Sequence, residues 1–140
     1  MIRLMNHNEI DKIMDIWITA IVSSHRFIDQ SFWLKQYHKV KQKLIDTPAY
    51  VICEQNQIVG FAMIAEYKYI AVYVISSKQG KGFGSLLIEY LKQRSDVLQA
   101  EVYIKNTASL HFFKKHGFEI ISQQKNLDSH QMQNLLQWHK

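Results

Sequence analysis

The sequence has little proline, little cysteine and no long apolar run. One proline among 140 residues, together with 47% hydrophobic residues, argues against a disordered chain. The single Cys53 cannot form an internal disulfide, which fits a reducing cytoplasm, and its alternation with Val51 predicts a packing role. No apolar run reaches the about 18 residues that span a bilayer, and residues 1–8 lack the pattern of a signal peptide. We therefore expect a cytoplasmic protein without a membrane partner.

The charged residues also form no dense block of one sign. Seventeen basic and twelve acidic side chains give a net charge of +5, but the basic residues are scattered, so we expect no nucleic-acid partner. The excess fits attraction of a polyanionic cofactor, or surface charge of no function. The seven histidines show no metal-ligand spacing, so no metal is expected. A chain of this length predicts a single domain over residues 1–140.

Glycine is scarce too, but three of the five glycines fall within one segment. Residues 79–85 read QGKGFGS and lie between an apolar stretch at 69–75 and an amphipathic one that follows. Alternate glycines let several backbone N–H groups point into one concavity, and a helix N-terminus adds positive potential. The positive charge of Lys81 strengthens this potential. The segment therefore predicts a phosphate site, although its spacing is neither G-x-G-x-x-G nor that of a P-loop.

Three segments of the chain carry a resemblance to one family. Gln79, Gly82 and Gly84 fit the pattern Q/R-x-x-G-x-G/A, which resembles the pyrophosphate loop of the GNAT superfamily of acyl-CoA-dependent N-acetyltransferases. Residues 106–118, NTASLHFFKKHGF, are similar to the second signature of the family, an Asn followed by a helix that ends in F-[YF]-x-x-x-G-F. A predicted hairpin over 50–65 contains the usual V-G-F. The resemblance spans residues 50 to about 124.

The fold that this resemblance implies is of the α/β class, with a mixed α+β sheet. The sequence pattern predicts helices over 9–22, 30–45, about 83–94 and 109–116, and strands over 2–4, 49–54, 58–66, 69–75, 98–105, 118–124 and 132–138. We expect a mostly antiparallel sheet flanked by about four helices, with strands 69–75 and 98–105 splayed apart. Trp17 and Trp33 are assigned to the core. The final strand is a candidate for pairing across a homodimer.

Acetyl-CoA is the cosubstrate that the resemblance implies. Its pantetheine arm is expected in the wedge between the splayed strands, along Val72, Tyr73 and Val74, with the backbone N–H of Val74 as oxyanion donor. An ordinary central strand is the simpler interpretation of these three residues. Asn106 is expected to bind the pantetheine, or merely to cap the next helix. The other expected cofactor-binding residues are Gln79, Gly80, Lys81, Gly82, Phe83, Gly84, Ser85, Phe112 and Phe113.

The thiolate that leaves has no obvious proton donor in this sequence. The family pattern implies a tyrosine at position 113, where this chain has Phe113, and a phenyl ring donates no proton. A thiol with an ordinary pKa of about 8–9 can leave without help. Tyr103, Tyr73 or a water held by them could take over the role.

The general base is open as well. The two positions that the resemblance favours are Ile70, which has no proton chemistry, and Lys68, which would need a strongly lowered pKa. Glu66 lies nearby on the same predicted hairpin. His25, within the segment SSHRF, has an ordinary pKa suited to base catalysis near neutrality. Glu66 and His25 therefore remain the candidates.

Two functions from different classes follow. The first is an acetyl-CoA-dependent N-acetyltransferase that acts on an unidentified primary amine of a small molecule or a protein. The second is an acyl-CoA-binding sensor or regulatory module with impaired catalysis, which Phe113, Ile70 and Lys68 favour. Amine-dependent release of CoA would distinguish them. The acceptor pocket is expected near residues 25–31 and 125–131.

Overall fold

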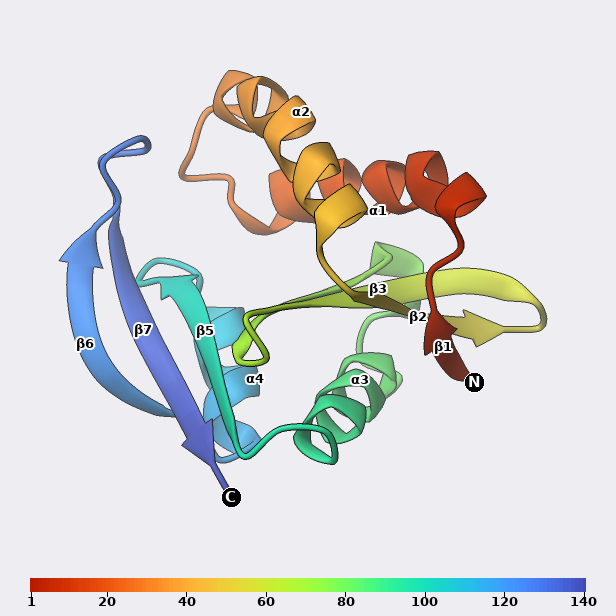
Figure 1. Ribbon diagram of the computed structural model, residues 1–140. Coiled ribbons are helices and arrows are strands. Elements are labelled where there is room, and N and C mark those ends of the chain that lie inside the picture. The colour runs from red at the N-terminus through yellow and green to blue at the C-terminus, as the bar shows by residue number, and fades with distance from the viewer.

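The computed structural model describes residues 1–140 and shows one seven-stranded sheet between two pairs of helices (Figure 1). Helices α1 and α2 cover one face and helices α3 and α4 the other. The helices are α1 (Ile10–Ser24), α2 (Gln30–Asp46), α3 (Phe83–Lys92) and α4 (Thr107–Lys115). The strands are β1 (Ile2–Leu4), β2 (Ala49–Glu54), β3 (Gln57–Ala65), β4 (Tyr69–Val74), β5 (Val97–Tyr103), β6 (Glu119–Lys125) and β7 (Met132–His139). No helix is both long and apolar enough to cross a bilayer.

The sheet is antiparallel except at its centre, which confirms the predicted fold class. Its strand order is β1-β2-β3-β4-β5-β7-β6, and only β4 and β5 run parallel. Strand β4 pairs with β3 along its whole length, whereas it pairs with β5 only where Tyr69 lies opposite Gln99. Beyond that point the two strands separate, as the resemblance implied. We call this opening between β4 and β5 the seam.

Each face of the sheet carries its own hydrophobic core. On the side of α3 and α4, Leu87 and Leu91 pack with Leu98 and Leu136, all fully buried. On the side of α1 and α2, the core includes the buried Trp17 and Trp33, as predicted, together with Ile13, Met14, Val51 and Phe61. Burying one such side chain contributes about 1.5–3 kcal/mol. Two separate cores let the sheet open at its centre without leaving either face uncovered.

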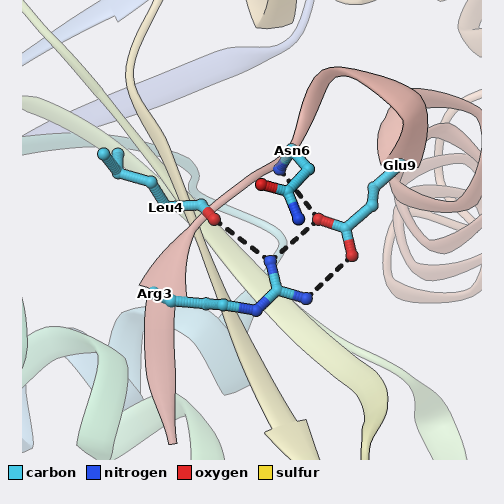
Figure 2. A network of polar contacts seen from close by, with 4 residues as sticks. All are labelled: Arg3, Leu4, Asn6 and Glu9. Atoms are coloured by element: carbon cyan, nitrogen blue, oxygen red, sulfur yellow. Dashed lines mark hydrogen bonds and ion pairs between the residues drawn. The ribbon is translucent and has the colours of Figure 1, made fainter.

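A network of polar contacts fixes the corner between β1 and α1 (Figure 2). The guanidinium of Arg3 donates to both carboxylate oxygens of Glu9, at 2.9 and 2.8 Å, and to the carbonyl of Leu4. Glu9 also accepts from the backbone N–H of Asn6 at 2.8 Å. The hydrogen bond from Arg3 outweighs burial and lowers the pKa of Glu9 to about 2. The network sets the direction in which α1 leaves the sheet.

The final strand is not an edge strand. β7 lies between β5 and β6, and Leu136 pairs with Ala100 on one side and with Ile120 on the other. The prediction that residues 132–138 pair across a dimer is therefore wrong, because the backbone groups of β7 on both sides already have partners. Chain order alone could not reveal this, since β7 inserts between two strands that precede it.

Candidate active site

The seam opens into a cavity of about 720 Å³ on the sheet. Its walls come from the C-terminal end of α1, from α2, from both strands of the seam, and from α4 and β7. His25, Glu66, Tyr73, Tyr103 and Phe113 line it, so the structure brings together side chains that the sequence analysis had chosen separately. Most of the lining is hydrophobic or aromatic, with a few polar groups, as is usual for small-molecule sites.

Backbone groups of β4 are available to a ligand in this cavity. The N–H of Ile75 donates to the carbonyl of Val59 on β3 at 2.9 Å. Because hydrogen bonding alternates along an antiparallel pair, the backbone of Tyr73 also faces β3, and the N–H groups of Val72 and Val74 face the seam. At that level β5 has moved away. The fit to pantetheine is direct, since its two amides can replace the missing ladder partners.

The glycine-rich loop lies at the mouth of the seam. Gly80 and Gly82 have φ values of +76° and +91°, which side chains rarely adopt, and Gly82 is the N-cap of α3. A Cβ on Gly84 would lie 3.2 Å from the ring of Phe112, so this glycine lets α3 approach α4. The side chain of Gln79 donates to the carbonyl of Val74 at 3.0 Å and joins the loop to β4.

The first turn of α3 completes an anion cradle. No side chain caps this helix, so its first N–H groups remain available to an anion. Lys81 is exposed beside them, Phe83 packs on the core below, and the hydroxyl of Ser85 lies 2.9 Å from Nε2 of His116. The predicted phosphate site thus has the local geometry that anion binding requires.

His25 ties α1 to the start of α4. It is 7% exposed, and its Nδ1 lies 3.0 Å from the carbonyl of Ile21 and 2.7 Å from Oγ of Ser24. With the proton on Nδ1, Nε2 accepts from the side-chain amide of Asn106 at 3.2 Å. Burial lowers the pKa of His25 below its ordinary value. The lone pair on Nε2 is therefore already hydrogen-bonded, and His25 could act as a base only if the hydrogen bond from Asn106 were broken.

Asn106 performs the capping role that was one of its two expected roles. Its Oδ1 accepts from the backbone N–H of Ser109 at 3.3 Å, at the start of α4, while its amide group turns to His25. Asn106 is one of the residues that line the cavity. A contact with pantetheine remains a prediction.

Tyr73 and Tyr103 line the cavity and carry hydroxyl groups that could donate a proton. Tyr103 is buried, and its hydroxyl donates to Oγ of Ser129 at 3.0 Å. Burial raises the pKa of Tyr103, and it raises the pKa of Tyr73 to about 12, so both phenols stay protonated at neutral pH. Phe113 is 7% exposed and lines the same cavity without a hydroxyl.

Two carboxylates line the cavity, and sequence reasoning found only one of them. Glu66 lies on the exposed turn between β3 and β4, at the closed end of the seam, with a φ of +53°. Glu101 lies on β5, two residues before Tyr103, and therefore on the same face of the strand. The alternation of Gln99, Glu101 and Tyr103 was the signal that could have identified it. Gln133 of β7 was missed because the position of that strand was not known.

An open seam beside an anion cradle defines an acyl-CoA-binding protein, and the comparison with family models agrees. A model described as "Acetyltransferase (GNAT) domain" matches residues 46–120, more than half of the chain. The protein belongs to this family. Membership confirms the predicted enzyme class, an N-acetyltransferase, and acetyl-CoA as its cosubstrate.

Curated relatives and solved structures extend the comparison. The chain is 29% identical over 123 residues to the peptidyl-lysine N-acetyltransferase YiaC of Escherichia coli K12, covering 86% of this chain and 84% of that protein. It is 27% identical to YjaB of Salmonella typhimurium, covering 85% and 83%. The solution structure of apo YjaB from Escherichia coli has a TM-score of 0.86 at 23% identity, covering 99% and 96%. The structure of yncA from Salmonella typhimurium with its cofactor acetyl-CoA has a TM-score of 0.71 at 21% identity, covering 99% and 92%.

Proposed function

We propose that the protein transfers the acetyl group of acetyl-CoA to the ε-amino group of lysine side chains in proteins. Two curated relatives named peptidyl-lysine N-acetyltransferases support this acceptor. The cavity supports it as well, because Glu66 and Glu101 supply negative charge for an ammonium group. Aromatic walls at Tyr73 and Trp33 suit the aliphatic part of a lysine side chain. The lone, half-buried Cys53 is consistent with a cytoplasmic location.

The single observation that carries the proposal is the row of free backbone groups on β4. Val72 and Val74 hold the pantetheine arm as an added strand would, and Tyr73 contributes its side chain to the cavity. The pyrophosphate is held at the mouth of the seam. The residues that bind it are Gln79, Gly80, Lys81, Gly82, Phe83, Gly84 and Ser85. The proposed cofactor contacts on α4 are Asn106 at its N-cap, Phe112 and Phe113.

Val74 provides the oxyanion contact. Acetyl-CoA, when bound, supplies a thioester carbonyl whose oxygen gains negative charge as the amine attacks. The N–H of Val74 faces the seam and has no partner on β5. A fixed donor of this kind contributes about 3–4 kcal/mol to stabilisation of the transition state. The hydrogen bond from Gln79 to the carbonyl of Val74 holds the next peptide unit, which joins Val74 to Ile75.

Glu101 removes the proton from the acceptor ammonium, directly or through one water. Glu101 lines the cavity two residues along β5 from Gln99, where β4 and β5 have already separated, and it is exposed there. Glu66, also exposed, lies on the turn at the closed end of the seam and contributes to attraction of the ammonium. His25 acts as a positioning residue, because its Nε2 holds Asn106. A carboxylate needs no displaced hydrogen bond to accept a proton.

Tyr103 stabilises the departing thiolate in place of the tyrosine that Phe113 replaces. Tyr103 lines the cavity and stays protonated because burial raises its pKa, and to donate to the thiolate its hydroxyl must turn away from Oγ of Ser129. A neutral phenol that donates a hydrogen bond lowers the basicity of the leaving thiolate. Since the thiol is a good leaving group, this contribution is smaller than that of the base.

The experiment that tests the proposal combines binding and turnover. Acetyl-CoA is titrated by calorimetry, and release of the CoA thiol is then measured with three peptides of one sequence. One has a free lysine and a blocked N-terminus, one a free N-terminus and acetylated lysine, and one has both blocked. We expect release with the first peptide only. Release with the second alone would overturn the lysine assignment, and absence of acetyl-CoA binding would overturn the site.

A further inference from the structure

Three polar side chains meet beside the anion cradle in a way that the proposed reaction does not use. His116, at the C-terminal end of α4, lies with Nε2 2.9 Å from Oγ of Ser85 and with Nδ1 3.6 Å from a carboxylate oxygen of Glu89. Ser85 and Glu89 are one turn apart on α3. The imidazole is largely buried and packs against the ring of Phe112, with 4.8 Å between ring centroids. These contacts hold the ring in one orientation.

The role of Ser85 depends on which atom carries the shared proton. A serine hydroxyl has one hydrogen to donate. If Nε2 of His116 is unprotonated, it accepts that hydrogen, and Ser85 has none left for an anion. If Nε2 carries a proton, it donates to Oγ, and the hydrogen of Ser85 can turn to an anion at the first turn of α3. Glu89 favours a proton on Nδ1, so the form with both nitrogens protonated suits the whole arrangement.

We propose, on the basis of the proposed function, that His116 is a positioning residue for the cofactor pyrophosphate. It donates from Nε2 to Ser85, which in turn donates its hydroxyl hydrogen to a pyrophosphate oxygen, while the carboxylate of Glu89, 3.6 Å from Nδ1, forms an ion pair with the protonated ring. The pyrophosphate is thereby linked to an imidazolium two hydrogen bonds away. Binding of the cofactor is then coupled to uptake of a proton by His116.

The charges around His116 give the direction of this coupling. In the free protein, burial lowers the pKa of His116, as do Lys92 on α3 and Lys115 on α4, while Glu89 acts in the opposite direction. A dianionic pyrophosphate nearby raises that pKa. A ligand that raises the pKa of a group binds more tightly below that pKa, so affinity should increase as the pH falls from 8 to 6.

The test uses 3′-dephospho acetyl-CoA, whose pyrophosphate does not titrate in this range, because the 3′-phosphate of acetyl-CoA would itself titrate near pH 6. Its affinity is measured by calorimetry at pH 6, 7 and 8 for the wild type, His116→Gln, His116→Phe and Ser85→Ala. His111→Gln is the matched control, since His111 is an exposed histidine of the same helix. Melting temperatures establish that each variant is folded.

We expect the wild type and His111→Gln to bind about threefold to tenfold more tightly at pH 6 than at pH 8, the range of one hydrogen bond. His116→Gln should keep part of the affinity and lose the pH dependence, because its amide donates but does not titrate. His116→Phe and Ser85→Ala should both bind weakly at every pH. An unchanged pH profile in folded His116→Gln would overturn the role of His116 while leaving the proposed function intact. Absence of acetyl-CoA binding by the wild type would overturn both.

Discussion

The two edges of β4 differ in what they do with the same backbone. On one edge, β4 pairs with β3 from Tyr69 to Val74 without a break. On the other, it meets β5 only at Tyr69 and leaves the N–H groups of Val72 and Val74 without a ladder partner. Buried backbone groups without partners are costly, so a folded protein keeps them where a ligand or water can bind them. The paired edge stabilises the fold, and the open edge is the site that we propose binds the cofactor.

Glu101→Gln should produce the largest change on the open edge. Loss of a general base lowers kcat by about 10²-fold to 10⁴-fold. Binding of acetyl-CoA should be unchanged, because Glu101 lines the cavity but is not among the residues proposed to hold the cofactor. Steady-state kinetics with a lysine peptide measure the first effect and calorimetry the second.

Glu66→Gln is the matched control, since it removes the same charge from the exposed end of the cavity. We expect less than about a tenfold loss of activity, mainly through a higher KM for the peptide. A larger loss of kcat in Glu66→Gln than in Glu101→Gln would exchange the roles of the two carboxylates.

Gly82→Ala should weaken acetyl-CoA binding by about tenfold to a hundredfold. An added Cβ meets no atom within 4 Å, but alanine at a φ of +91° is strained by about 1–3 kcal/mol, and relief of the strain distorts the loop. Unchanged affinity in a folded Gly82→Ala variant would remove the loop from the site. Gly84→Val is a less selective test, because its side chain would also press on Phe112.

Removal of the proposed proton donor to the thiolate should have a smaller effect on kcat. Tyr103→Phe is expected to lower kcat by about tenfold, and Phe113→Tyr to preserve or raise it by adding a hydroxyl to the cavity wall. The double variant should recover part of the activity that Tyr103→Phe loses. If Phe113→Tyr instead lowers kcat strongly in a folded protein, position 113 tolerates no hydroxyl and the assignment of roles along α4 fails.

A substitution at the corner between β1 and α1 should have the smallest effect on the seam. The pKa of Glu9 is lowered to about 2 in the folded protein, so its contribution to stability is complete above pH 4.5 and is lost as the pH falls toward 2. Because the pair is partly exposed, we expect Glu9→Gln to reduce the free energy of unfolding by about 1–2 kcal/mol at pH 7. Urea unfolding at pH 7 and pH 3 measures this, and a difference from the wild type that does not shrink at pH 3 would contradict it. Acetyl-CoA affinity should not change.

The part of the site that depends on local sequence could be predicted. Alternate glycines, the strand before them and the helix after them specify the anion cradle between Gln79 and Ser85, because turn and helix-end geometry depend on neighbouring residues. The segment 106–118, which resembles the second signature of the family, likewise predicted the cap at Asn106 and the missing hydroxyl at Phe113. Two 3-10 turns, at His7–Glu9 and Ser76–Lys78, were not predicted, since single turns leave little periodicity.

The part that depends on strand order could not be predicted. The position of β7 beside β5 follows from how distant strands share hydrophobic surface, and no local pattern encodes it. The role proposed for Glu101 depends on the opening of the seam at its level, and on a fully paired β5 it would be an ordinary polar residue. The contact between His25 and Asn106 joins residues 81 positions apart in the chain.

The most direct test is amide hydrogen exchange in β4, measured residue by residue by NMR with and without acetyl-CoA. The account predicts that Tyr73 is protected in both states, and that Val72 and Val74 exchange rapidly in the free protein and slowly in the complex. The claim that the open edge of β4 binds the cofactor would be contradicted if Val72 and Val74 were protected before acetyl-CoA is added. It would also be contradicted if they still exchanged rapidly in the complex.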